Sequence, residues 1–163
     1  MRVFLDFEAS SLAKRSYPIE VAWAFEDGRT ESFLIRPAPD WTDWDTEAQA
    51  IHGIERGMLV REGVDHEFVA RHMVEVLTGH DLLASAPSWD GKWLSALLRA
   101  AGFPRHMLRL RSSREACREC AEAALRTLVG AERLAILVDG LLAQTERVGG
   151  VVAAHRALPD ALE

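Results

Sequence analysis

The sequence has few cysteines, no long apolar run and no excess of positive charge, and each absence excludes a class of protein. Two cysteines, Cys117 and Cys120, provide no disulfide scaffold and fit a reduced, cytoplasmic setting. No apolar run approaches the ~18 residues that a membrane span needs, and the apolar run directly before Asp6 has only three residues, so we expect neither a membrane segment nor a secretory signal. The formal net charge is −6, so bulk electrostatics repel a polyanion.

The composition is that of an ordinary globular domain. Hydrophobic residues make up 48% and charged residues 27% of the sequence, which excludes disorder and a collagen-like fibre. The 163 residues are enough for one compact domain and not comfortably for two. No internal repeat, low-complexity tract or linker divides the sequence, so we expect one domain over residues 1–163.

The first third of the chain is predicted to form strands. Strand-like segments cover residues 2–7, 18–26 and 29–36. The second begins at Pro18, where a missing N–H is tolerated, and Asp27-Gly28 is a strong hairpin signal before the third. We therefore expect a three-stranded antiparallel meander, followed by a loop over residues 37–46 that is rich in helix and strand breakers.

From about residue 46 the apolar period becomes helical. Apolar residues between positions 68 and 77 have the i, i+4, i+8 spacing of a core-facing helix that ends at Gly79. Residues 82–86 are predicted to be a short buried strand, and further helices are predicted at residues 89–101, 112–128 and 131–147. The apolar run at residues 134–138 is expected to be core. This order predicts an α/β fold with a mixed sheet and helices on both faces.

Asp6 and Glu8 lie at the end of the first apolar strand. On a strand, residues i and i+2 point to the same side, roughly 7 Å apart. Burying two like charges is costly unless hydrogen-bond donors or a cation neutralise them, and a divalent metal is the simplest cation. The same spacing recurs at Asp45/Glu47 and Asp65/Glu67. Those pairs lie in a loop and at a helix start, where solvated or capping carboxylates are expected. For the first pair, a solvated strand end is the alternative.

His155 and Asp160 form a second candidate pair. Five residues correspond to ~500° of rotation on a helix, so the two side chains would not share a face of one continuous helix. Pro159 fits the first turn of a helix, which would place Asp160 in that turn and His155 in the preceding loop, both leaning toward one cavity. The alternative is that Asp160 complements the helix dipole and that His155 is an ordinary surface residue.

Asp90 is the third candidate, because it directly follows the strand predicted at residues 82–86. Helix capping or first-turn charge would explain an aspartate at this position without any chemistry. However, the C-terminal ends of strands are where open α/β sheets place their functional sites. Asp90 is therefore a candidate member of the same site.

Together these residues resemble a known family. The motifs are, in chain order, Asp6-Phe7-Glu8, Trp89-Asp90 followed by Trp93-Leu94, and His155-x-x-x-x-Asp160. They resemble the three motifs of the DEDDh 3′–5′ exonucleases, a DnaQ-like family that includes polymerase proofreading subunits, ribonuclease T and oligoribonuclease. The resemblance covers nearly the whole chain, and Ile51-His52-Gly53-Ile54 is similar to a motif that many members carry.

The sequence departs from the family pattern in three places. Ala9-Ser10-Ser11-Leu12 follows the first motif without the usual glycine, and Ala86-Pro87-Ser88 stands where relatives carry His-Asn. Relatives usually continue the last helix well past its aspartate, whereas this sequence stops at Glu163. These differences put nucleotide contacts near the second motif and the anchoring of Asp160 in question.

The resemblance implies an RNase H-like fold, with an antiparallel three-stranded meander plus parallel strands, and a two-metal mechanism. Asp6, Glu8 and Asp160 would bind the first Mg²⁺ or Mn²⁺ ion, with Asp6 bridging to the second. Asp90 would be a further metal-site residue that positions the attacking water. His155 would take the proton from that water. Carboxylate-only ligation argues against zinc.

The implied products are nucleoside 5′-monophosphates released from a 3′ end. RNA or short oligonucleotides are slightly favoured over DNA, because the chain is small and stands alone like oligoribonuclease, although nothing in it reads the 2′-hydroxyl. The family often dimerises, so a homodimer is among the implied partners. The rival interpretations are an inactive nucleic-acid-binding or scaffold domain on the same fold, and an unrelated α/β protein with scattered acids.

Further residues are candidates for contacting the substrate. They are Phe7 through its backbone, Ala9, Leu12 as an apolar wedge against the terminal base, His52, and Trp89 as a stacking surface. Trp93 is expected to pack in the core. The five arginines between positions 105 and 118 are typical of a solvated face, or would guide a phosphate backbone. A zinc or redox role for Cys117 and Cys120 is disfavoured, because the chain has no second cysteine pair.

Overall fold

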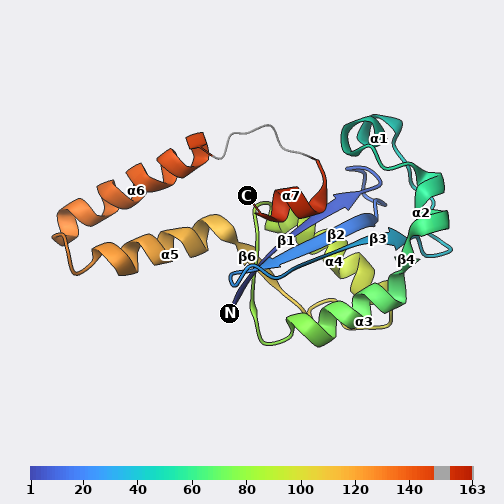
Figure 1. Ribbon diagram of the computed structural model, residues 1–163, viewed down its shortest axis with the longest axis horizontal. Helices are drawn as coiled ribbons and strands as arrows, with labels where there is room; N and C mark the ends of the chain where they lie inside the picture. Colours follow the sequence, from blue (N-terminus) through green and yellow to red (C-terminus); the bar gives the residue numbers. More distant parts are fainter. Residues whose placement is uncertain (149–154, 163) are drawn as a thin grey trace.

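A computed structural model describes residues 1–148 and 155–162 of the protein. This part of the chain forms a six-stranded mixed sheet (Figure 1). In spatial order the strands are β4 (Val64–Asp65), β3 (Thr30–Arg36), β2 (Pro18–Phe25), β1 (Arg2–Ala9), β5 (Asp81–Ala84) and β6 (Leu110–Ser112). The pairs β1–β2 and β2–β3 are antiparallel, and the pairs β1–β5, β5–β6 and β3–β4 are parallel. The predicted mixed sheet is confirmed.

The meander of β1, β2 and β3 follows the local signals in the sequence. Gly28 adopts a left-handed φ of +90° at the hairpin, a conformation that glycine reaches without steric cost. The Phe25 N–H donates to the Arg29 carbonyl over 2.8 Å and closes the turn. In β1 the buried side chains alternate, whereas all eight residues of β2 are buried. β2 is therefore covered on both faces.

Four helices follow the meander: α1 (Thr46–His52), α2 (Arg56–Glu62), α3 (His66–Leu77) and α4 (Pro87–Ala100). Two of them begin at aspartates that cap backbone N–H groups. Asp45 accepts from the Glu47 N–H over 2.9 Å, and Asp65 accepts from the N–H groups of Glu67 and Phe68 over 3.0 and 3.3 Å. The capping explanation for these two Asp-x-Glu pairs is confirmed.

Helices cover both faces of the sheet, as predicted. Apolar side chains of α3 and α4, among them Met73 and Leu97, pack in one core cluster with Leu5 of β1. On the opposite face, α7 (Ala157–Leu162) lies across β1 and β2 (Figure 1). There Ala157 and Ala161 pack against Ala22 of β2. Because all three side chains are small, α7 approaches the sheet closely.

The helices α5 (Ser113–Leu125) and α6 (Ala131–Val148) form a hairpin that projects from the sheet (Figure 1). The expectation that residues 134–138 are core is wrong for most of the run. Val138 is buried, but Ile136 is 72% exposed. The reason is that α6 packs against α5, so one narrow side of the helix is covered while the rest faces solvent.

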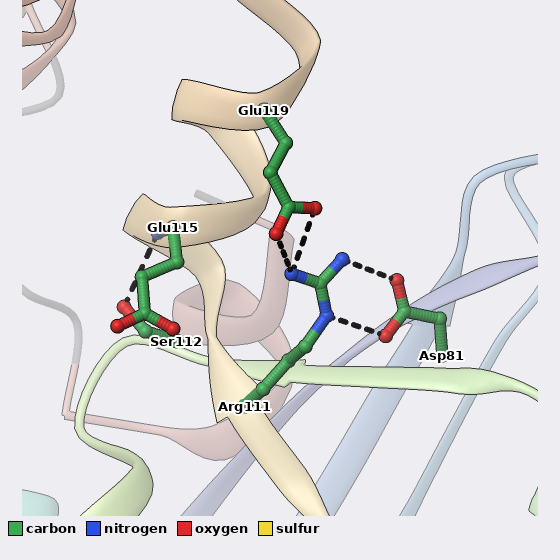
Figure 2. A network of polar contacts seen from close by, with 5 residues as sticks. All are labelled: Asp81, Arg111, Ser112, Glu115 and Glu119. Atoms are coloured by element: carbon green, nitrogen blue, oxygen red, sulfur yellow. Dashed lines mark hydrogen bonds and ion pairs between the residues drawn. The ribbon is translucent and has the colours of Figure 1, made fainter.

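A polar network joins the base of this hairpin to the sheet (Figure 2). Arg111 of β6 donates to both carboxylate oxygens of Asp81 over 2.7 Å, and it also contacts Glu119 of α5 over 3.0 Å. The Ser112 hydroxyl accepts from the Glu115 N–H over 3.4 Å and caps α5. These contacts fix where α5 leaves the sheet. Among the described residues, no helix combines the length and apolar character needed to cross a membrane.

Candidate active site

Asp6 and Glu8 point from β1 toward α7. Partners in an antiparallel register share a face of the sheet, and Asp6 pairs with Ala22 while Glu8 pairs with Glu20. Ala22 packs against α7, so the two carboxylates lie on that face. Their neighbour Phe7 alternates to the other face and is buried in the main core. The strand period therefore separates the carboxylates from the apolar core.

Asp160 joins the two strand carboxylates from α7. One carboxylate oxygen each of Asp6, Glu8 and Asp160 lies within 4.8 Å of the others. Asp160 is in the first turn of α7, and His155 precedes the helix, so the predicted placement of these two residues is confirmed. Residues more than 150 positions apart in the chain thus meet at one point.

Burial and mutual repulsion make these carboxylates hard to ionise together. The pKa of Asp6 is raised from 3.8 to about 8, first by burial and then by the charges of Asp90 and Glu8. The pKa of Glu8 is raised from 4.5 to about 7, first by burial and then by the charge of Asp160. A partly buried group of acids with such values needs an external positive charge to be fully ionised at neutral pH.

The three carboxylates fit a divalent cation. Oxygen ligands on opposite sides of one Mg²⁺ ion lie about 4.2 Å apart, because each Mg–O distance is about 2.1 Å. The limit of 4.8 Å among the carboxylate oxygens is therefore close to a chelating arrangement. All three ligands are oxygens, which suits Mg²⁺ or Mn²⁺.

Asp90 lies beside this group and not within it. Its side chain is 2% exposed in the first turn of α4, and Oδ2 has no hydrogen-bond partner among the described residues. Burial raises the pKa of Asp90 to about 6, and hydrogen bonds with the backbone of Phe7 and Ala86 limit the rise. Its charge acts on Asp6, but it is outside the set of three oxygens within 4.8 Å. Its role in metal binding stays a prediction.

His155 lines a cavity of about 330 Å³ together with Glu8. It is the one described non-glycine residue with a positive φ, +49°, a conformation that costs free energy for a side chain with a Cβ atom. The imidazole is exposed. The structure thus brings the predicted base to the rim of the carboxylate site, held by a strained backbone.

Three of the candidate substrate-binding residues line the same cavity: Ala9, Leu12 and His52. Leu12 is 68% exposed, which fits an apolar contact surface. The Ile54 N–H donates to Nδ1 of His52 over 3.0 Å, so a neutral ring carries its proton on Nε2. Burial lowers the pKa of His52 and favours this neutral form, and Nε2 is buried with no partner among the described residues.

The other two candidates lie outside this cavity. The Phe7 side chain is buried in the core, as predicted, so only its backbone remains available to a ligand. Trp89 is 40% exposed and stacks on the buried Trp93 with 5.7 Å between ring centroids. Lys92 Nζ lies 5.0 Å from the Trp89 ring centroid. The cavity also includes an α1 residue that was not singled out from the sequence, Ala48.

Two charged residues next to the site were missed from the sequence: Glu20 and Arg156. Glu20 is buried on β2, and Arg156 Nη2 contacts its Oε1 over 2.6 Å. A carboxylate inside the otherwise apolar segment 18–26 was a signal for Glu20. Nothing in the sequence marked Arg156, since its partner is more than 130 positions away.

Most of the arginines singled out from the sequence have structural roles or lie elsewhere. Arg111 is held by Asp81 and Glu119, and Arg118 contacts Asp139 over 2.7 Å. Arg105 and Arg109 line a separate cavity of about 310 Å³ beside α4. The cysteines of α5 are free, with Cys117 exposed.

The fold is similar to that of solved exonuclease I structures. No protein-family model and no curated protein matches the sequence. Exonuclease I from Methylocaldum szegediense is 18% identical with a TM-score of 0.60, and the match covers 68% of this chain and 27% of that one. E. coli exonuclease I in complex with a dT13 oligonucleotide is 18% identical with a TM-score of 0.59, over 78% and 30% of the two chains.

A zinc-bound form of the complex of E. coli exonuclease I with single-stranded DNA is 17% identical with a TM-score of 0.60. The match covers 74% of this chain and 29% of that one. The chain thus spans about a third or less of the length of these structures. At such identities the likeness concerns the fold, and it agrees with the fold that the sequence motifs imply. The protein therefore has the RNase H-like, mixed α/β fold of the exonuclease I structures.

Proposed function

We propose that this protein is a metal-dependent 3′–5′ exonuclease that releases nucleoside 5′-monophosphates from single-stranded 3′ ends. The observation that carries the proposal is the convergence of Asp6, Glu8 and Asp160, whose oxygens lie within 4.8 Å of one another. Stability alone does not explain three acids on one partly buried surface, because they repel one another. The similarity of the fold to exonuclease I supports a nuclease.

Asp6, Glu8 and Asp160 would hold a divalent ion, with Asp90 next to Asp6 as the further acidic residue. Divalent ions in such a site lower the pKa of water, offset charge on the phosphate and stabilise the departing oxygen. We propose Mg²⁺ or Mn²⁺, two ions per site, because the ligand atoms are carboxylate oxygens.

His155 is proposed as the general base. Imidazole is the side chain that ordinarily exchanges a proton near neutral pH. From the rim of the cavity, His155 would accept a proton from the water whose oxygen attacks the terminal phosphorus. The bond from phosphorus to the 3′ oxygen of the preceding nucleotide then breaks, that oxygen takes a proton from solvent to become the new 3′-hydroxyl, and the terminal nucleotide leaves with a 5′-phosphate. The products are a shortened chain and a nucleoside 5′-monophosphate.

The cavity beside Glu8 and His155 is proposed to hold the terminal nucleotide. Its volume of about 330 Å³ is at the small end of the range of ligand pockets, which suits one nucleotide. Leu12 and Ile51 offer apolar surface to an unpaired base, and the His52 ring lines the same cavity. An unpaired base is available at a single-stranded end, and a net charge of −6 disfavours a long duplex. RNA and DNA ends both fit this description.

The test is nucleotide release from labelled oligonucleotides. Single-stranded RNA and DNA labelled at the 5′ end are incubated with Mg²⁺, Mn²⁺ or a chelator, and a parallel set carries a blocked 3′ end. We expect a ladder of products shortened from the 3′ end, which disappears with chelator or with the block. Asp6→Asn should abolish it, whereas Asp65→Asn, in another Asp-x-Glu pair, should not. Metal binding without any nucleotide release would instead indicate an inactive binding domain on the same fold.

A further inference from the structure

A fourth acidic residue, Glu20, lies at the edge of the carboxylate site but is not one of the three convergent acids. It is 4% exposed in β2 and pairs with Glu8 in the β1–β2 register, so its side chain points toward α7. A buried carboxylate needs hydrogen bonds or an opposite charge. The protein itself supplies both, from the residues at the start of α7.

Both oxygens of Glu20 are engaged by two consecutive residues. Arg156 Nε donates to Oε2 over 3.0 Å and to Oε1 over 3.2 Å, and Arg156 Nη2 donates to Oε1 over 2.6 Å. The backbone N–H of Ala157, the first residue of α7, donates to Oε2 over 3.0 Å. This is a bidentate, charge-assisted arginine–carboxylate contact. Such a contact fixes the orientation of the guanidinium group as well as its distance from the carboxylate. Glu20 therefore holds the point where α7 begins.

In the sequence, Arg156 lies between His155 and Asp160, the proposed base and metal ligand of the third motif. His155 immediately precedes Arg156 and has the left-handed φ of +49°, which persists only where neighbouring contacts impose it. On the other side, the Asp160 N–H donates to the Arg156 carbonyl over 3.2 Å, so Asp160 is one turn from the contact. Movement of Arg156 would therefore shift both side chains.

The apolar packing of α7 is thin. The helix has six residues, and a helix this short is not stable by itself. Its buried side chains are Ala157 and Ala161, which pack against Ala22 and bury little apolar surface. The polar contact with Glu20 thus adds a directional link between α7 and the sheet.

We propose that Glu20 and Arg156 are a positioning pair, which holds Asp160 against Asp6 and Glu8 and holds His155 at the rim of the cavity. This positioning role rests on the proposed function, because that function identifies the carboxylate site as a metal site. The quantity that the role predicts is the affinity of the site for metal, and not the rate of nucleotide release. Neither residue needs to touch the substrate. They act through the placement of α7.

Removing Arg156 should have opposite effects on metal affinity, depending on whether the residue acts through its charge or by positioning α7. Arg156 is a cation close to the acids, so a purely electrostatic role means that Arg156→Ala should strengthen cation binding. A purely structural role means that the variant melts at a lower temperature but binds metal normally while folded. A positioning role means that the folded variant binds metal more weakly, because Asp160 is no longer held near Asp6 and Glu8.

The experiment is a Mn²⁺ titration, followed by the electron paramagnetic resonance of free Mn²⁺, on the full chain. Arg156→Ala and Glu20→Gln should each weaken Mn²⁺ binding by about 10–100-fold, the loss typical of residues that orient metal ligands. Arg156→Lys should recover part of the affinity, since it keeps the charge but not the bidentate contact. Arg29→Ala is the matched control, because it removes another arginine–carboxylate contact, that of Arg29 with Asp27 over 2.9 Å, at the opposite end of β1.

Each result has a defined meaning. Unchanged or tighter Mn²⁺ binding in folded Arg156→Ala and Glu20→Gln would overturn the positioning role and leave the proposed function intact. If Arg156→Ala melts below the assay temperature, Arg156→Lys and Glu20→Gln decide by the same measurement. Tight binding by the unsubstituted protein without nucleotide release would contradict the proposed function alone. No Mn²⁺ binding by the unsubstituted protein would contradict both.

Discussion

Two Asp-x-Glu pairs in this protein have the same spacing and opposite surroundings. Asp6 and Glu8 lie at the end of a central strand, facing α7 and a third carboxylate. Asp65 and Glu67 lie at the start of α3, where Asp65 accepts hydrogen bonds from two backbone N–H groups and is exposed to solvent. The first pair is partly buried beside another carboxylate and needs a cation to be ionised. Asp65 of the second pair already has hydrogen-bond donors and solvent, so it needs no cation.

The difference shows that spacing does not identify a site. A helix N-terminus supplies N–H donors and a favourable dipole to a carboxylate, so an acid there needs no other partner. The end of a central strand supplies neither, and burial raises the pKa of Asp6 to about 8. The need for an external cation is therefore a property of the surroundings of the acids. Each prediction below tests this contrast.

The largest expected effect comes from neutralising the first aspartate of each pair. Asp6→Asn should lower metal-dependent nucleotide release by about 1,000-fold, because several kcal/mol of charge stabilisation are lost and each factor of ten corresponds to about 1.4 kcal/mol. Asp65→Asn should leave the rate within about twofold, since asparagine also caps helices well. Rates on the same 5′-labelled oligonucleotide measure both. Equal losses in the two variants would contradict the assignment of the site.

The next largest effect distinguishes the proposed general base, His155, from the carboxylates that would bind the metal. His155→Ala should lower turnover by about 10²–10⁴-fold, the usual contribution of a general base, while Mn²⁺ affinity stays close to that of the unsubstituted protein. Steady-state kinetics and a Mn²⁺ titration on the same preparation provide the two readings. Retention of full turnover would remove His155 from the mechanism, and a parallel loss of affinity would indicate that it helps to bind the metal.

A smaller effect is a pH dependence of stability in the metal-free protein. Because the pKa of Asp6 is raised from 3.8 to about 8 in the folded state, its contribution to stability is fully present below pH 3.8 and is lost as the pH rises through about 8. Glu8, raised from 4.5 to about 7, acts in the same direction. The melting temperature should therefore fall between pH 5 and pH 9, by about 2–4 °C for each kcal/mol lost.

Asp6→Asn should flatten this decline, and saturating Mn²⁺ should reverse it, because the cation binds the ionised acids. Asp65→Asn should keep the decline of the unsubstituted protein. Thermal melts at several pH values, with and without Mn²⁺, provide the comparison. A metal-free protein whose melting temperature rises with pH over this range would contradict the raised pKa values.

The smallest effect concerns the second pair alone. Asp65→Ala removes the cap of α3 and should cost about 1 kcal/mol, a fall of about 2–4 °C in melting temperature. Metal binding and nucleotide release should not change, because the cap is not among the residues of the site. Differential scanning calorimetry and the oligonucleotide assay measure the two quantities. A change in metal affinity would show that α3 and the site are coupled.

The parts of the fold predicted from sequence are those with local causes. The short apolar segment around Asp6 and the Asp27-Gly28 turn fix β1, β2 and β3 by short-range chemistry. The strands β4 and β6 were missed because two or three residues are too few to show a period. The run at residues 134–138 looked like core because its composition is apolar, and composition does not reveal that α6 has α5 as its packing partner.

The same limit applies to the site. Asp6, Glu8 and Asp160 were singled out from a combination of burial pattern and family resemblance, and the structure brings them together. Glu20 and Arg156 were missed, since their contact exists only after a strand near the start of the chain meets a helix at its end. The cavity residue Ala48 of α1 was missed for the same reason, because it meets Glu8 and Ala9 of β1 only once the chain is folded.

The most direct measurement is a crystal structure determined in Mn²⁺ with anomalous diffraction data. A manganese peak bounded by the carboxylates of Asp6, Glu8 and Asp160, and lost in an Asp6→Asn crystal, is the predicted result. No peak at that position in crystals kept with Mn²⁺ at pH 9, above the raised pKa values of Asp6 and Glu8, with the three side chains turned apart, would contradict the metal centre and the nuclease function proposed from it.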